Sequence, residues 1–113
     1  MNSIKKSLDL PQVVADYFEA DKSDSDTLSQ CFTDNAVVKD EGHTYKGRAA
    51  IRKWKEDSSA KYQYTSEPVA CERKNGKIIV SSHLIGNFPG SPVDLRYIFK
   101  LAGKNIASLE IIP

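Results

Sequence analysis

The chain has 113 residues, enough for one packed domain but too few for two. Sixteen Lys and Arg residues nearly balance 15 Asp and Glu residues, so the basic surplus typical of nucleic-acid-binding proteins is missing. No apolar run is long enough to cross a membrane, and the N-terminal residues lack the apolar segment of a secretory signal. These features favour a cytoplasmic protein with no nucleic-acid or membrane partner.

The two cysteines, Cys31 and Cys71, are isolated and show no metal-binding spacing. One disulfide stays open as an alternative, although isolated cysteines in apolar surroundings are more often buried thiols. No set of histidines and carboxylates has metal-ligand spacing, and no glycine-rich phosphate loop or G-x-S-x-G motif occurs. We therefore expect neither a metal nor another cofactor.

Residues 1–9 are predicted to be flexible, and residues 10–113 to form one domain. Asp9 and Pro11 are typical of a helix start, because Asp can cap and Pro suits a first turn. Apolar side chains then recur at helical spacing through residues 10–18. The sequence predicts an amphipathic first helix there.

Three further elements are predicted before residue 62. Asp24 or Ser25 is expected to cap a short second helix, Asn35 to begin a strand, and Gly47 to open a third helix. This third helix also carries a dense basic run, which we interpret as its solvated face. The run consists of Arg48, Arg52, Lys53 and Lys55.

The rest of the chain is predicted to be four strands paired as successive hairpins. Pro68 indicates a bulge or an edge, and Asn75-Gly76 indicates a tight hairpin turn. Residues 93–102 alternate cleanly, so one side chain in two faces the core. The inward set is Leu95, Tyr97, Phe99 and Leu101, and the outward set is Asp94, Arg96, Ile98 and Lys100. Helices followed by an antiparallel meander indicate an α+β fold.

Four stretches carry a resemblance to a known family: VVADYFEA, CFTDNAVVKDEG, YKGRAAIRKW and GNFPGSPVDLRYIFKLAGKNIASLEI. With these residues in this order, the chain resembles the nuclear transport factor 2-like superfamily, in particular its SnoaL-like and ketosteroid-isomerase-like members. The resemblance covers residues 10–112 and implies a cone-shaped, cystatin-like α+β domain. Three helices would pack on a curled, mainly antiparallel sheet, with a pocket between them and a homodimer through the outer sheet face.

The resemblance also implies two catalytic residues. Asp40 falls where the ketosteroid isomerases keep their general base, and Tyr17 falls where they keep a tyrosine that donates to the developing oxyanion. The isomerases add a protonated aspartate as a second donor, and here Leu95 or Tyr97 takes its place. Asp94 has the wrong parity for that position, because a shift of one residue turns a side chain to the opposite face.

The residue types leave a simpler interpretation open: Asp40 as a solvated strand end, and Tyr17 as a core aromatic. His83 faces outward if Val80 and Leu84 face the core, and otherwise it reaches the pocket, where an imidazole could transfer protons. We predict a pocket wall built from aromatic residues together with this histidine. The predicted set is Trp54, Tyr62, Tyr64, His83, Tyr97 and Phe99.

Two functions follow as hypotheses. The first is an apolar pocket that binds a small molecule, with isomerisation by proton abstraction next to a carbonyl. The alternative is a non-catalytic module that dimerises or binds a partner through the outer face. This face would hold Arg96, Ile98 and Lys100, together with His83 if that side chain points outward.

Overall fold

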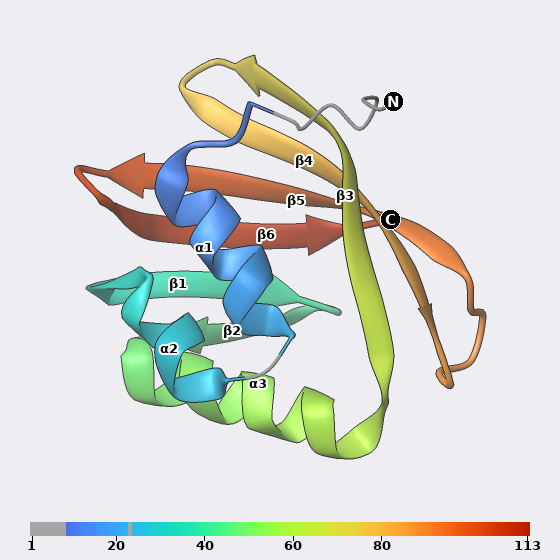
Figure 1. Cartoon of the computed structure of the whole chain (residues 1–113). Helices are drawn as coiled ribbons and strands as arrows, with labels where there is room; N and C mark the ends of the chain where they lie inside the picture. Colours follow the sequence, from blue (N-terminus) through green and yellow to red (C-terminus); the bar gives the residue numbers. More distant parts are fainter. Residues whose placement is uncertain (1–8, 23) are drawn as a thin grey trace.

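The computed structural model describes residues 9–22 and 24–113 (Figure 1). Apart from Asp9, the segment predicted to be flexible lies outside the described residues. The described residues form three helices and six strands. These are α1 (Gln12–Asp21), α2 (Ser25–Gln30), β1 (Phe32–Asp40), β2 (His43–Lys46), α3 (Arg48–Lys61), β3 (Tyr64–Lys74), β4 (Lys77–Gly86), β5 (Val93–Ala102) and β6 (Asn105–Ile112).

All six strands form one sheet in the order β2-β1-β6-β5-β4-β3. Strands β3 to β6 pair as successive antiparallel hairpins, as predicted. Strand β1 lies parallel to β6, with Val38 opposite Leu109. The sheet is therefore mixed, and the predicted α+β class is confirmed.

The short strand β2 was not predicted. Its sequence HTYK lacks the apolar alternation typical of a strand, so the sequence gives no local signal for it. β2 pairs with β1 across the two-residue turn Glu41-Gly42. Both turn residues have positive φ, 52° and 80°, as a type I′ hairpin turn requires. This tight turn fixes where β1 ends.

Several local signals in the sequence were correct. The Asp24 side chain caps α2 by accepting a hydrogen bond from the Asp26 backbone N–H, and the β3 ladder has a bulge between Pro68 and Ala70. The helix start at Asp9 is wrong, because Pro11 occupies the N-cap of α1 and no side chain caps it.

The helices cover one face of the sheet, with α1 crossing it and α3 running near β1 and β2 (Figure 1). Between α1 and the sheet lies a buried aromatic cluster with mostly edge-to-face ring contacts. Each such side chain contributes about 1.5–3 kcal/mol through burial. The cluster consists of Tyr17, Phe18, Phe32, Tyr97 and Phe99.

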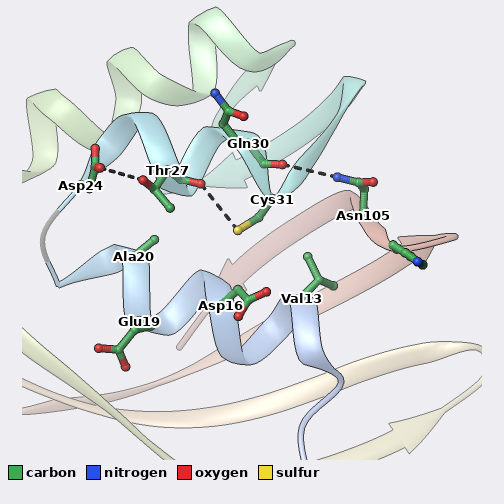
Figure 2. A pocket seen from close by; sticks show the side chains of 10 residues that line it. Val13, Asp16, Glu19, Ala20, Asp24, Thr27, Gln30, Cys31 and Asn105 are labelled. Atoms are coloured by element: carbon green, nitrogen blue, oxygen red, sulfur yellow. Dashed lines mark hydrogen bonds between the residues drawn. The ribbon is translucent and has the colours of Figure 1, made fainter.

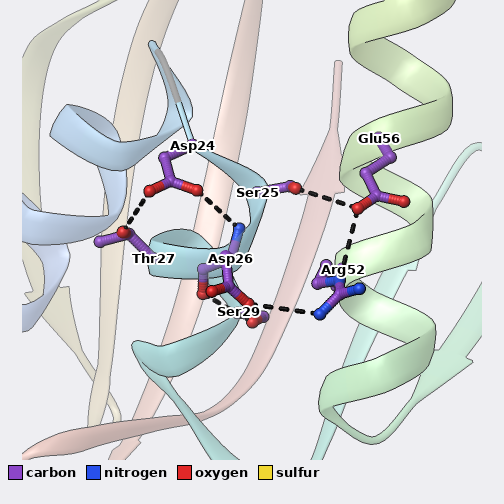
Figure 3. Close-up of polar contacts among 7 residues, drawn as sticks. All are labelled: Asp24, Ser25, Asp26, Thr27, Ser29, Arg52 and Glu56. Atoms are coloured by element: carbon purple, nitrogen blue, oxygen red, sulfur yellow. Dashed lines mark hydrogen bonds and ion pairs between the residues drawn. The ribbon is translucent and has the colours of Figure 1, made fainter.

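Exposed polar contacts join α2 to α3 (Figure 3). Arg52 reaches Asp26 and Glu56, each at 3.3 Å, and Ser25 donates to Glu56. All three charged side chains are at least half exposed. Exposed pairs of this kind contribute about 0–1 kcal/mol each.

The basic run of α3 is only partly solvated. Arg48, Arg52 and Lys53 form exposed ion pairs, as predicted. Lys55 is 4% exposed and lies against Asp21 of α1, so its assignment to the solvated face is wrong. In the described part of the chain, no helix has the length and apolar character needed to cross a membrane.

Candidate functional site

A cavity of about 610 Å³ opens between the C-terminal half of α3, the β1–β2 turn and the β4–β5 connection. This volume is typical of small-molecule sites. Its walls come from nearly every element of the domain. They are Tyr17, Asp40, Glu41, His43, Tyr45, Trp54, Asp57, Ser58, Lys61, Tyr62, Tyr64, Leu84, Phe88, Pro89, Gly90, Val93, Leu95, Tyr97 and Ile111.

Asp40 lies in the wall of this cavity because of strand parity. Ala36 and Val38 are fully buried on the inner face of β1, and Asp40 follows at the same parity. It is half-buried, and one carboxylate oxygen, Oδ2, accepts a hydrogen bond from Trp54 Nε1 at 3.0 Å. The carboxylate thus lies at the end of a core strand but faces the cavity.

Burial is the main influence on the pKa of Asp40 and raises it above its usual range. The Trp54 hydrogen bond lowers this pKa, the negative charge of Glu41 raises it, and His43 lowers it. A carboxylate with a raised pKa in a cavity is suited to accept a proton.

Tyr17 projects from α1 into the same cavity and is 1% exposed. Burial first, and then the negative charge of Asp21, raises the pKa of Tyr17. The phenol therefore stays protonated and can donate a hydrogen bond.

Of the other residues predicted to line a pocket, Trp54, Tyr62, Tyr64 and Tyr97 lie in the cavity wall. Both residues aligned with the second donor, Leu95 and Tyr97, also lie there. Burial is again the main cause of the raised pKa of Tyr97, whose hydroxyl stays protonated.

Two predicted wall residues lie elsewhere. His83 is on the opposite face of β4, because Ser82 and Leu84 take the buried positions. Its Nδ1 lies 2.6 Å from Oδ1 of Asp94, so its prediction as a pocket residue is wrong. Phe99 is fully buried in the aromatic cluster rather than in the cavity wall.

A buried ion pair lies behind the wall. Lys55 Nζ donates to Asp21 Oδ1 at 2.7 Å and to the Tyr64 hydroxyl at 3.2 Å. The Tyr64 hydroxyl donates to Asp21 at 3.3 Å. The Tyr64 ring lines the cavity while its hydroxyl is held by this pair, and burial followed by the Asp21 charge raises the pKa of Tyr64. The Lys55–Asp21 pair therefore ties α1, α3 and β3 together.

Sequence reasoning missed several wall residues. Tyr45 was missed because β2 was missed; it pairs with Val38 and so shares the inner face. Asp57 and Lys61 follow Trp54 on α3 by one and two turns, a spacing that identifies them once Trp54 is placed. They bring charge to the rim of the cavity.

Between residues 9 and 113, leaving out Ser23, no group of three or more His, Cys, Asp or Glu side chains could hold a metal ion. Both cysteines are free thiols.

A second, shallower hollow of about 500 Å³ lies between α1 and α2 (Figure 2). Cys31 Sγ donates to the Thr27 carbonyl, and Asn105 donates to the Gln30 carbonyl. Burial raises the pKa of the Cys31 thiol to about 11, so it is protonated at neutral pH. These groups are paired with one another, and the hollow offers no reactive group comparable to Asp40.

Comparisons with known proteins show which family and which solved structures this chain resembles. The SnoaL-like domain family matches residues 14–107. A Sinorhizobium meliloti protein named "putative polyketide cyclase" is 41% identical, with 91% of this chain and 95% of that chain covered and a TM-score of 0.87. Among curated proteins, no sequence matches this chain.

Two more distant structures share the fold. A Catenulispora acidiphila protein with a ketosteroid isomerase-like fold, in complex with trimethylamine, is 19% identical over 91% of this chain and 85% of that one, with a TM-score of 0.81. An epoxide hydrolase/cyclase-like enzyme of pyran ring formation in the polyether salinomycin is 22% identical over 89% and 87%, with a TM-score of 0.76. The family match and the 41% identity show that this chain belongs to the SnoaL-like domain family.

Proposed function

We propose that this protein binds a small, largely apolar carbonyl compound in the cavity and removes a proton from the carbon next to the carbonyl. The observation that carries the proposal is the position of Asp40: a half-buried carboxylate in the wall of a 610 Å³ cavity, with a raised pKa and no cationic partner among the described residues. In this proposal the sheet curls around the helices as a cone and encloses the ligand.

The residues support a simple division of roles. Ionised Asp40 takes the proton as general base, and the protonated Tyr17 hydroxyl donates to the carbonyl oxygen as it becomes an enolate. Tyr97 lines the same wall, so its hydroxyl is the candidate second donor in this proposal. Ketosteroid isomerase, whose fold this chain resembles, pairs an aspartate base with a tyrosine donor in the same way.

The aromatic walls favour a flat or polycyclic ligand. Tyr45, Trp54, Tyr62 and Tyr64 surround a volume that fits a molecule of several rings. The similarity to a protein named for polyketide cyclisation supports an aromatic or polyketide-like substrate. Isomerisation and ring closure both begin with the same enolate, so one assay of proton removal covers both.

The test is proton exchange in D₂O with a panel of steroid ketones, aromatic polyketide analogues and short carbonyl compounds. Deuterium incorporation next to the carbonyl is followed by NMR for the wild type and for Asp40→Asn. General-base catalysis contributes roughly 10²–10⁴-fold, so we expect the variant to lose that factor for any compound the wild type accelerates. Equal exchange rates for both proteins, or no acceleration across the panel, would contradict the proposal.

A second function, a dimerising module, has its own supporting observation. Val69 and Ile85 are large apolar side chains on the paired strands β3 and β4 that remain 55% and 53% exposed. Exposed apolar residues of this kind mark interaction surfaces when they cluster. We infer a homodimer through the outer sheet face, with Ile98 and His83 alongside. Sedimentation velocity of the wild type should give a mass of twice 12.6 kDa. Ile85→Lys should lower this mass by weakening the dimer. A monomeric wild type would rule the dimer out.

A further inference from the structure

Trp54 makes the one side-chain hydrogen bond that Asp40 accepts within the described residues. We propose that Trp54 is the positioning residue of Asp40: its indole N–H holds Oδ2 and thereby assigns Oδ1 as the oxygen that takes the proton. This inference rests on the proposed function, because it concerns how Asp40 acts as a base.

The geometry supports a directed contact. Trp54 Nε1 lies 3.0 Å from Oδ2, and the indole is 8% exposed. A carboxylate without such a partner can rotate about its terminal bond, since this torsion is broad. With Oδ2 engaged, the carboxylate has one defined orientation, and Oδ1 is the oxygen left without a protein donor among the described residues.

Asp40 and Trp54 both belong to regular secondary-structure elements. Asp40 is the last residue of β1 before the two-residue turn, and Trp54 is one turn after the fully buried Ile51 on α3. The Tyr45 ring of β2 packs against the indole, with centroids 6.0 Å apart and an interplanar angle of 35°. Catalysis requires that a base be held in a precise position. A base fixed between a strand and a helix keeps its position better than a base on a loop.

The chemical nature of the donor matters. A neutral indole N–H favours the ionised carboxylate less than a lysine or arginine would. Burial therefore still keeps the pKa of Asp40 above its usual range, while the indole contact restrains that rise. In its ionised form, this carboxylate is a better base than an ion-paired aspartate. The other titratable groups in the wall are Tyr17, Glu41, His43, Tyr45, Asp57, Lys61, Tyr62, Tyr64 and Tyr97.

The first experiment needs no substrate. Trp54 is the single tryptophan of the chain, so a ¹⁵N-labelled sample gives one indole N–H resonance. We expect this resonance to shift with pH as Asp40 ionises, and the shift to vanish in Asp40→Asn. An indole resonance that does not titrate, or that titrates equally in Asp40→Asn, would overturn the proposal. Because no catalysis is involved, this result is independent of the carbonyl chemistry.

The second experiment uses Trp54→Phe in the D₂O exchange assay. Loss of a hydrogen bond to a charged group should lower the plateau rate by roughly tenfold and move the midpoint of the pH profile to higher pH. KM should change little, since the aromatic wall is kept. Ile51→Val, on the same buried face of α3 and outside the cavity wall, is the control for general loosening and should keep the wild-type midpoint. A wild-type midpoint in Trp54→Phe would refute the positioning role.

If Trp54→Phe does not fold, the indole titration of the wild type and Asp40→Asn still decides the question. If the indole titrates as expected but no compound exchanges, the contact is right and the proposed function is wrong. The two failures are thus separable.

Discussion

Asp21 and Asp40 are two aspartates close to the same cavity, and they differ in what they bind. Asp21 accepts a 2.7 Å hydrogen bond from the Lys55 ammonium, and its side chain is 7% exposed. Asp40 accepts a 3.0 Å bond from a neutral indole and faces the open cavity. A cation beside a carboxylate fixes its charge and its place, whereas a neutral donor fixes its place and leaves it reactive. From this comparison we propose a structural role for Asp21 and a chemical role for Asp40.

The largest effect is expected from breaking the Lys55–Asp21 pair. Lys55→Met leaves a buried carboxylate without its cation, and such losses cost about 3–5 kcal/mol of folding free energy. Urea unfolding of the wild type and the variant measures this. A loss below about 1 kcal/mol would show that the pair is not needed for stability.

The matched control is the double variant Asp21→Leu with Lys55→Met. Replacing both charges with apolar groups removes the buried charge altogether and is often close to neutral. The double variant should therefore be more stable than Lys55→Met alone. If the double variant is less stable than Lys55→Met, losing the hydrogen bonds to the Tyr64 hydroxyl costs more folding free energy than leaving the Asp21 carboxylate without its cation.

Replacing Asp40 is expected to change the folding free energy less than replacing Lys55, and to stabilise the protein rather than destabilise it. Its pKa is raised in the folded protein, so the folded state binds the proton more tightly than the unfolded chain. Stability conferred by this group is present at low pH and falls as pH rises from the unfolded pKa to the folded one. Asp40→Asn should thus stabilise the protein at pH 7, by about 0.5–1 kcal/mol.

The pH dependence provides the check on that gain. Below the usual pKa of aspartate both states hold the proton, and the difference between wild type and Asp40→Asn should disappear. Thermal unfolding of wild type and Asp40→Asn, at neutral pH and at acidic pH, measures the stability difference under each condition. A variant that is less stable than wild type at pH 7 would mean that the ionised carboxylate stabilises the fold.

Much of the fold could be predicted because local signals and periodicity agreed. Three local signals each indicated one structural feature: a tight turn at Asn75-Gly76, a bulge at Pro68, and a strand from the alternation of residues 93–102. β2 could not be predicted, because four residues without apolar alternation become a strand only by pairing with β1. The parallel contact of β1 with β6 joins residues far apart in sequence and leaves no local signal.

Part of the candidate site could be predicted from the sequence. The parity of Ala36, Val38 and Asp40 already predicts an inward carboxylate once β1 is recognised. Lys55 was misassigned because its sequence neighbours are solvated cations, and only the tertiary position of Asp21 makes it a buried partner. The Trp54–Asp40 hydrogen bond likewise joins a helix and a strand end whose relative placement the sequence does not encode locally.

The most direct test of the central claim is one exchange measurement on three proteins: the wild type, Asp40→Asn, and the double variant Asp21→Leu with Lys55→Met. We predict that Asp40→Asn loses roughly 10²–10⁴-fold of the accelerated proton exchange, while the folded double variant stays within about tenfold of wild type. A double variant that loses the activity while Asp40→Asn retains it would place the chemistry at the other aspartate and contradict the role proposed for Asp40.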